Sequence, residues 1–238
     1  MHLKNTQFGL NEEQEAVLDA ADKFGKKELF PLAEKMDNEE WWPDGIFKKM
    51  GDAGLVGLTV DPEFGGAGMS YLQAGLVCQA FGRWNHAMAL SWVAHDNLCL
   101  DNIYRNGSQY IREKYLPGLC SGKLVGALGL TEPGAGSDAL GSMRTTAKKE
   151  GDHYVLNGSK TYITNGSIAD VVIVYAKTDI NKGNKGITAF VVETNNPGFN
   201  VVSKLKKMGF RGSQTSELFF ENFKVPAKNI LGEEGKGH

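Results

Sequence analysis

A glycine-rich stretch near the middle of the chain has the residue types that can hold a flat, oxygen-rich ligand. Residues 125–138 read V-G-A-L-G-L-T-E-P-G-A-G-S-D. Thr131 and Ser137 supply hydroxyl groups, and the closely spaced glycines leave backbone N–H groups unobstructed. A flavin or a phosphate could be held in this way. The alternative interpretation is a glycine-rich turn that joins two strands.

The same stretch also matches the fingerprint of a nicotinamide-binding site, but only superficially. Gly134-Ala135-Gly136, followed by Ala139, fits the pattern G-x-G-x-x-A. That fingerprint requires a helix directly after the glycines, within a βαβ unit. Here the next periodic segment predicts a β-hairpin, because Glu150-Gly151-Asp152 separates two short strand-like runs. The sequence therefore disfavours a nicotinamide site.

The first half of the chain is expected to be helical. Apolar residues recur at helical spacing from Asn11 onward, and Asn11 with Gln14 forms a capping-box start. Further helices are expected over these ranges: about Pro43–Ala53, Tyr71–Trp84, His86–Asn106 and Ser108–Leu116. The run 65–68, G-G-A-G, predicts a loop between them.

After residue 122 the pattern changes to short β-branched and aromatic runs separated by Gly, Asn and Asp. Strands are expected at His153–Leu156, Asp170–Ala176, Thr188–Glu193 and Glu217–Phe220. The fold class predicted is therefore α+β, with an all-α N-terminal domain followed by an antiparallel, barrel-like β domain. We place the two domains at residues 1–122 and 123–238.

Composition and charge exclude several classes of function. The net charge is −2, with acids and bases interspersed, so no basic surface for nucleic acid or for an anionic membrane is predicted. The N-terminus lacks a basic flank followed by an apolar stretch, and we expect a cytoplasmic protein. The three cysteines, Cys78, Cys99 and Cys120, show no C-x-x-C pair, which predicts reduced core residues and no metal site.

Four segments in order resemble the acyl-CoA dehydrogenase family. The most specific is T-E-P-G-A-G-S-D at 131–138. The others are the glycine-rich segment 54–70, the segment N-G-S-K-T-Y-I-T-N-G at 157–166, and K-L-K-K-M-G-F-R-G-S-Q-T at 204–215. The stretches 94–99 and 105–107 are similar to the isovaleryl-CoA branch of the family.

The resemblance implies that two segments line FAD. Thr131 and nearby backbone amides would reach the edge of the isoalloxazine, and Thr164 would donate a hydrogen bond to flavin N5. Tyr162 stands where many relatives carry Trp, and either ring can cover the flavin face. The full set of cofactor-binding residues implied is Leu128, Gly129, Leu130, Thr131, Glu132, Pro133, Gly134, Ala135, Gly136, Ser137, Tyr162, Ile163 and Thr164.

The resemblance also implies where an acyl-CoA would bind. Ser137 would contact the CoA portion, and Tyr175 and Ala176 match positions that border it; the alternative for the latter two is a buried strand. Asp96 falls in the region that forms the acyl pocket. It either lines that pocket, where it would favour a polar substrate, or is a solvated or capping aspartate. His95 is expected to be a hydrogen-bonded helix residue and not a metal ligand.

The implied reaction is α,β-dehydrogenation of a short or branched acyl-CoA, with electrons passed to electron-transfer flavoprotein. The family's catalytic base is a Glu of a C-terminal helical domain, and the resemblance places it beyond His238. No catalytic residue is therefore assigned in this chain, and Asp96 is kept as a candidate base. We expect the chain alone to be inactive, and a homotetramer only for the longer proteins of the family. The alternative is a noncatalytic assembly module that retains part of an FAD or CoA surface.

Overall fold

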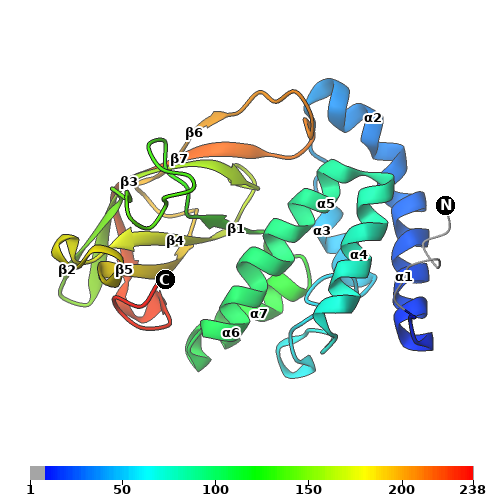
Figure 1. The fold of residues 1–238 in the computed structure, drawn as a ribbon, viewed down its shortest axis with the longest axis horizontal. Helices are drawn as coiled ribbons and strands as arrows, with labels where there is room; N and C mark the ends of the chain where they lie inside the picture. Colours follow the sequence, from blue (N-terminus) through cyan, green and yellow to red (C-terminus); the bar gives the residue numbers. More distant parts are fainter. Residues whose placement is uncertain (1–8, 238) are drawn as a thin grey trace.

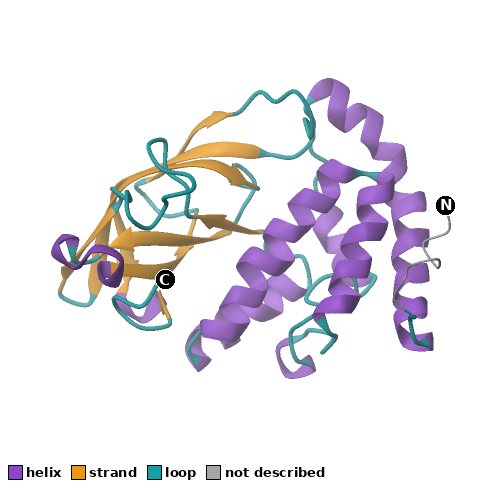
Figure 2. Ribbon diagram, viewed as in Figure 1, coloured by secondary structure: helices purple, strands orange, loops and turns teal. Residues whose placement is uncertain are grey.

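The computed structural model describes residues 9–237, in which the helices come first and the strands second (Figures 1 and 2). The helical segments are α1 (Glu12–Phe24), the π-helical η1 (Gly25–Leu29), α2 (Phe30–Glu39), α3 (Ile46–Asp52), the 3-10 turn η2 (Pro62–Phe64), α4 (Tyr71–Trp84), α5 (His86–Val93), the π-helical η3 (Ala94–Asp101), α6 (Asn102–Asn106) and α7 (Gln109–Cys120). None of the helices described is long and apolar enough to cross a membrane.

Local signals in the sequence position several of these helices. The Asn11 side chain accepts from the Gln14 N–H at 2.9 Å, and the Gln14 side chain accepts from the Asn11 N–H at 3.1 Å, which confirms the capping box. α4 has the predicted bounds, and α5, η3 and α6 together fill the predicted range 86–106. α7 was expected to stop at residue 116 but runs through Pro117, because its last turn buries Leu119 and Cys120 in the core.

The sequence did not predict α2, which continues the first helix after the π-helical turn η1. Gly25 opens that turn, and a Cβ atom on it would come within 2.6 Å of the Trp84 ring of α4. The close approach of these two helices therefore requires glycine at this position.

The second half forms one sheet of eight strands that curls around its own core. The segments are β1 (Gly126–Gly129), β2 (Thr146–Glu150), β3 (His153–Thr164), β4 (Val171–Lys177), the 3-10 segment η4 (Ile180–Gly186), β5 (Ile187–Glu193), β6 (Phe199–Lys204), β7 (Thr215–Pro226), the 3-10 turn η5 (Ala227–Asn229) and β8 (Ile230–Leu231). The order is β6-β7-β3-β2-β4-β5-β8, and β1 pairs with β4. The predicted hairpin is present, with β2 and β3 joined at Gly151 and Asp152.

The sheet is mostly antiparallel, as expected for the fold class. The exceptions are β1 against β4, which is parallel, and one parallel pair between β2 and β4. β3 and β7 are longer than the short runs predicted, because the two strands pair with each other along most of their length. Two bulges interrupt this pairing without ending it. The division of the chain at residue 122 stays a prediction.

β4 joins the two halves of the molecule through both of its faces. Val171 and Ile173 belong to the core of the helical half, whereas Val172 and Val174 belong to the core of the sheet. This explains why its sequence is continuously apolar and does not alternate. The loop between β6 and β7 makes a second connection, because it extends to α2 (Figure 1), where Arg211 lies 3.4 Å from Glu40.

Candidate functional site

The structure brings together the two segments that the sequence singled out. β1 leads into the glycine-rich turn, and β3 carries the second segment at its far end. The Thr161 N–H donates to the Thr131 carbonyl at 2.9 Å, which fixes the two segments side by side. The Lys160 ammonium adds a second link, since it lies 2.8 Å from the Glu132 carboxylate. Contacts between residues 28 and 30 positions apart in sequence thus hold the two segments together. We refer to the exposed residues of these segments, Gly134, Gly136, Ser137 and Tyr162, as the surface of Tyr162.

A β-bulge places Tyr162 on that surface. The register of β3 against β7 shifts between Lys160 and Ile163, and Tyr162 adopts a left-handed φ of 58°. Its side chain is 69% exposed, whereas the neighbouring Ile163 is buried. Left-handed backbone is unfavourable for an aromatic residue, and large aromatic side chains are usually packed. An exposed ring held on a strained backbone therefore indicates a site at which something else covers the ring.

The glycine-rich segment forms a tight turn with an open outer side. Glu132 and Ala135 exchange both of their backbone hydrogen bonds, at 3.0 and 3.1 Å. A Cβ atom at Gly134 would meet nothing within 4 Å, and one at Gly136 would meet only the Thr131 methyl group at 4.0 Å. Ser137 is exposed. No helix follows these glycines, which agrees with the prediction against a nicotinamide fingerprint.

Asn165 holds the end of β3 in place, and the sequence reasoning did not find it. It is fully buried, with a left-handed φ of 65°. Its amide donates to the Ser91 carbonyl of α5 at 2.8 Å and to the Gly126 carbonyl of β1 at 3.1 Å. Its residue type and its position could have identified it, because Asn tolerates left-handed backbone and this Asn directly follows the segment of Tyr162.

Asp96 is buried, and one of its carboxylate oxygens is already engaged by a backbone amide. It is 1% exposed, and its Oδ1 accepts the Gly57 N–H, with the Leu58 N–H as a further donor. The alternative of a solvated aspartate is therefore wrong. Helix η3 turns this side chain toward residues 57 and 58, where it accepts backbone N–H groups as a capping aspartate would. Burial raises the pKa of Asp96 to about 7 although these amides oppose the shift. Its role toward substrate stays a prediction.

His95 is a hydrogen-bonded helix residue, as predicted. Its Nδ1 accepts the Gly126 N–H at 2.8 Å, and its Nε2 lies 3.2 Å from the Leu119 carbonyl. Burial lowers the pKa of His95 to about 4, so the ring is neutral at physiological pH. Among residues 9–237, no three His, Cys, Asp or Glu side chains are grouped so that they could hold a metal ion. His95 therefore acts as a bridge between the helical half and β1.

Tyr175 and Ala176 lie on β4. Ala176 is buried in the core of the sheet. Tyr175 accepts from the Asn102 side-chain amide at 3.2 Å and lines a cavity of about 220 Å³ with Lys236. The buried-strand interpretation is correct for Ala176. A contact of Tyr175 with CoA stays a prediction.

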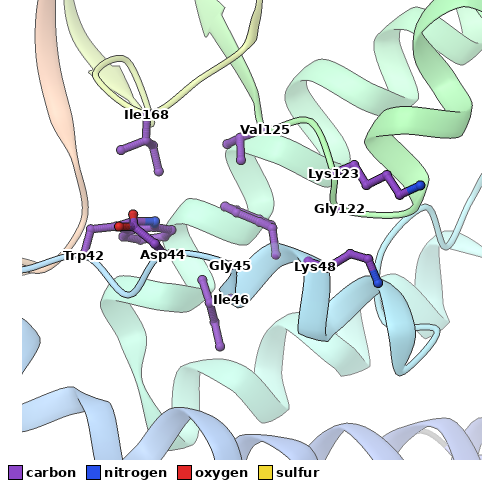
Figure 3. A pocket seen from close by; sticks show the side chains of 10 residues that line it. Trp42, Asp44, Gly45, Ile46, Lys48, Gly122, Lys123, Val125 and Ile168 are labelled. Carbon is purple, nitrogen blue, oxygen red and sulfur yellow. The ribbon is translucent and has the colours of Figure 1, made fainter.

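A larger cavity of about 340 Å³ lies at the junction of the two halves (Figure 3). Trp42 and Asp44 line one side, and Lys48 and Lys123 extend on the other. None of the residues predicted to bind FAD lines it. Because Lys48 is paired with Asp52, the cavity offers one unshared ammonium at most to a ligand. Because the predicted FAD residues are absent from its lining, this cavity is separate from the surface of Tyr162.

Two family models match the chain in order. The model described as acyl-CoA dehydrogenase, N-terminal domain, matches residues 11–123, and that described as acyl-CoA dehydrogenase, middle domain, matches residues 127–223. Mitochondrial isovaleryl-CoA dehydrogenase of Pongo abelii is 47% identical over 233 residues, which are 96% of this chain and 55% of the relative. The chain thus spans about half the length of the curated relatives it matches.

Solved structures agree with these matches. Butyryl-CoA dehydrogenase from Megasphaera elsdenii has 40% identity and a TM-score of 0.92, over 98% of this chain and 61% of that one. A chain whose structure is described as the electron transferring flavoprotein of Acidaminococcus fermentans has 40% identity and a TM-score of 0.94, with the same coverage. A glutaryl-CoA dehydrogenase from Mycobacterium smegmatis, solved with FADH2, has 33% identity and a TM-score of 0.88, over 95% and 57% of the two chains.

Proposed function

The chain belongs to the acyl-CoA dehydrogenase family, and we propose that it serves FAD-dependent α,β-dehydrogenation of a short or branched acyl-CoA thioester. The observation that carries this proposal is the meeting of two separate segments. The turn 130–137 and the bulge at Tyr162 form one surface, joined by the Thr161 N–H and the ion pair of Lys160. Both segments are those that the resemblance assigns to FAD.

The residues at this surface fit a flavin. The exposed ring of Tyr162 offers an aromatic face to a flat heterocycle. Gly134 and Gly136 leave the outer side of the turn open to a close approach by ligand oxygens. Thr164 is half-buried beside the bulge and carries a hydroxyl donor. These features together support binding of the isoalloxazine by 128–137 and 162–164.

Each of these residues would have a distinct task. FAD, when bound, supplies the acceptor for the hydride that leaves the β-carbon of the thioester. The Thr131 segment holds the cofactor edge through backbone amides, and Tyr162 excludes water from its face. The Thr164 hydroxyl donates a hydrogen bond to flavin N5 and so favours negative charge on it. The Ser137 hydroxyl binds the CoA portion of the substrate.

The finer parts of the proposal rest on the relatives. Acyl-CoA as substrate follows from the names of the dehydrogenases matched, and the isovaleryl branch from the relative that is 47% identical. Electron-transfer flavoprotein is proposed as the electron acceptor because one matched chain comes from a structure described by that name. A cytoplasmic location is proposed as well.

A second candidate function is binding without catalysis. The observation that favours it is the state of Asp96, the carboxylate considered as a base within this chain. It is 1% exposed, and its bonded oxygen is taken by the Gly57 amide. A module that presents FAD or CoA to a partner would have no need of a base.

The two candidates can be separated in one experiment with the purified 238-residue protein. FAD is titrated in and followed by flavin fluorescence, and isovaleryl-CoA or butyryl-CoA is then added without oxygen. Bleaching of the flavin absorbance would establish the dehydrogenase. Saturable FAD binding without bleaching agrees with the expectation that the chain alone is inactive, so acyl-CoA is then added together with the C-terminal helical part of a matched relative. Bleaching at that stage would establish the dehydrogenase, and its absence would favour the binding module. Absence of FAD binding would contradict both.

A further inference from the structure

A buried ion pair lies next to both segments of the proposed flavin surface. The Lys160 ammonium is 2.8 Å from Glu132 Oε1, and the two side chains are 0% and 6% exposed. Lys160 Nζ also donates to the Leu130 carbonyl at 3.2 Å. In sequence, Glu132 directly follows Thr131, and Lys160 precedes Tyr162 by two residues. The ion pair therefore links the glycine-rich segment, which contains Glu132, to the segment of Tyr162, which contains Lys160.

The carboxylate of Glu132 also closes the glycine-rich loop. Its Oε2 accepts the Arg144 N–H at 2.6 Å, and its Oε1 accepts the Thr145 N–H at 3.0 Å. The loop 133–143, which contains the open glycines and Ser137, thus starts beside Glu132 and returns to the same side chain. Both carboxylate oxygens accept hydrogen bonds, so the Glu132 side chain joins the start of the loop to its end.

Electrostatics agree with a fixed, charged pair. Burial alone would raise the pKa of Glu132, but the contacts with Lys160 and Thr145 outweigh it, and its pKa is lowered. Burial lowers the pKa of Lys160, against the opposing effect of Glu132. Buried ion pairs are often replaceable by apolar residues without loss of stability, because desolvation offsets their attraction. Stability alone therefore does not explain why charges occupy these two positions.

The strand geometry gives the pair a mechanical consequence. Lys160 is the last residue of β3 in register with β7 before the bulge, and Tyr162 lies inside the bulge. The Lys160 ammonium is buried and contacts both the Glu132 carboxylate and the Leu130 carbonyl, so it fixes the point at which the bulge begins. The Thr161 N–H then joins the bulge to the Thr131 carbonyl at 2.9 Å. Displacement of Lys160 would move the Tyr162 ring relative to the glycine-rich loop.

We propose that Glu132 and Lys160 are positioning residues that hold the loop 133–143 and the Tyr162 bulge at a fixed separation for FAD. The inference rests on the proposed function, because it concerns the same surface. Neither side chain needs to touch the cofactor for this role. Their contribution is to keep the free protein in the arrangement that binds, which lowers the ordering cost of binding.

The test measures FAD affinity and protein order separately, in the full chain. Lys160→Met should raise the FAD Kd by roughly 10- to 100-fold at a temperature at which the variant is fully folded, because charge-assisted contacts to two segments are lost. In the FAD-free protein, hydrogen exchange should become faster in the loop 133–143 and at the bulge. It should stay unchanged in α4. Lys114→Met is the matched control, since Lys114 pairs with Glu193 outside both segments, and its FAD Kd should equal that of the wild type.

A neutral double variant distinguishes positioning from stability. Glu132→Gln with Lys160→Met leaves neither charge unpaired, so its thermal stability should recover relative to Lys160→Met alone. Its FAD Kd should stay raised, because the amides of Arg144 and Thr145 keep only one good acceptor. A wild-type Kd in either folded variant would overturn the inference and leave the proposed function intact.

The remaining outcomes are also decisive. If the wild-type chain binds no FAD, the proposed function fails first. If wild type binds FAD but neither variant folds, the inference is overturned as well, because the pair would then be a requirement of the domain core. Uniformly faster exchange over the whole chain in Lys160→Met would have the same meaning.

Discussion

His95 and Asp96 are neighbours in sequence and both are buried, yet their side chains hold backbone amides of two different segments. His95 Nδ1 accepts the Gly126 N–H of β1 at 2.8 Å, whereas Asp96 accepts the Gly57 N–H of a loop in the helical half. Burial lowers the pKa of His95 to about 4 and raises that of Asp96 to about 7. Both side chains are therefore mostly uncharged between these values, which suits two adjacent groups inside a core.

The two residues should affect stability with opposite dependence on pH. The folded-state pKa of His95 lies below its ordinary value of 6.5, so its contribution is present above pH 6.5 and is lost as the pH falls through 4. The free energy by which wild type exceeds His95→Asn should therefore shrink by about 3 kcal/mol from pH 7 to pH 4. Urea unfolding at both pH values measures it. His86→Asn, on an exposed histidine, is the control for the substitution itself, and a constant difference for His95→Asn would contradict the prediction.

Asp96→Asn should show the reverse trend. The folded-state pKa is raised above 3.8, so the stabilising contribution is present below pH 3.8 and is lost as the pH rises through 7. Asn keeps an acceptor for the Gly57 amide. Relative to wild type, the variant should therefore gain up to about 4 kcal/mol in free energy of unfolding between pH 4 and pH 8. Asp37→Asn, at an exposed position, serves as the control for the substitution itself.

The same Asp96 variant bears on catalysis. Because the carboxylate is engaged by backbone amides, flavin bleaching by acyl-CoA, if wild type shows it, should persist in Asp96→Asn. Complete loss of bleaching in a folded variant that still binds FAD would instead support Asp96 as the base.

Local signals predicted much of the fold, and long-range pairings explain what they missed. The capping box of Asn11, the bounds of α4 and the hairpin at Gly151 each depend on residues a few positions apart, and all three were predicted. The burial of Asp96 depends on Gly57, 39 positions away. Nothing in the sequence around either residue reveals that contact.

The same distinction holds for the site. The motif 131–138 and the segment 157–166 identified both parts of the proposed FAD surface. The ion pair of Glu132 with Lys160 and the clamp of Asn165 on α5 were not identified, since each is a single contact between residues that are 28 and 74 positions apart. Residue type alone would have assigned Lys160 to the solvent, where lysines usually lie.

Asn165→Asp should be more damaging than Asn165→Gly. The Asn165 amide donates to two carbonyls, of Ser91 and Gly126, and a carboxylate in its place would face both oxygens without a proton to give. We expect a loss of about 3–5 kcal/mol in free energy of unfolding for the Asp variant, as for an unpaired buried charge. Asn165→Gly keeps the left-handed backbone and should lose about 1–3 kcal/mol. Urea unfolding at pH 7 checks both values, and equal losses would show that a carboxylate at this position costs no more than the loss of the amide donor alone.

Thr164→Val tests the proposed donor to the flavin. The two side chains have nearly the same shape, and Thr164 is only half-buried, so folding should be preserved. In a protein that contains all three domains of the family, loss of one hydrogen bond to an atom that becomes charged should slow flavin reduction by acyl-CoA by roughly 10- to 100-fold, equivalent to about 1–3 kcal/mol. Stopped-flow absorbance at the flavin bands measures this rate. Thr146→Val, at a half-buried position on β2, is the control for the substitution itself. An unchanged rate and flavin spectrum for Thr164→Val would remove Thr164 from the site.

Tyr162→Gly should separate the stability of the fold from the binding of FAD. The left-handed backbone at Tyr162, with φ of 58°, costs roughly 1–3 kcal/mol in a residue with a side chain, and glycine relieves that cost. Glycine also adds about 0.4–1 kcal/mol of conformational entropy to the unfolded chain. Because the ring is 69% exposed, little burial is lost with it. The free energy of unfolding should therefore stay equal or rise by about 1 kcal/mol.

The FAD affinity of Tyr162→Gly should move the other way. If the ring covers the flavin, its removal should raise the Kd roughly tenfold or more, because an aromatic contact and the burial that goes with it are lost. Tyr162→Phe keeps the ring and should bind FAD like wild type, whereas Tyr162→Ala loses the ring but keeps the backbone strain, so it should be less stable than Tyr162→Gly and bind equally poorly. Thermal unfolding and FAD titration on the three variants give both quantities. A glycine variant that is destabilised but binds FAD normally would show that Tyr162 serves the fold and not the cofactor, and the surface assigned to the flavin would then have to lie elsewhere.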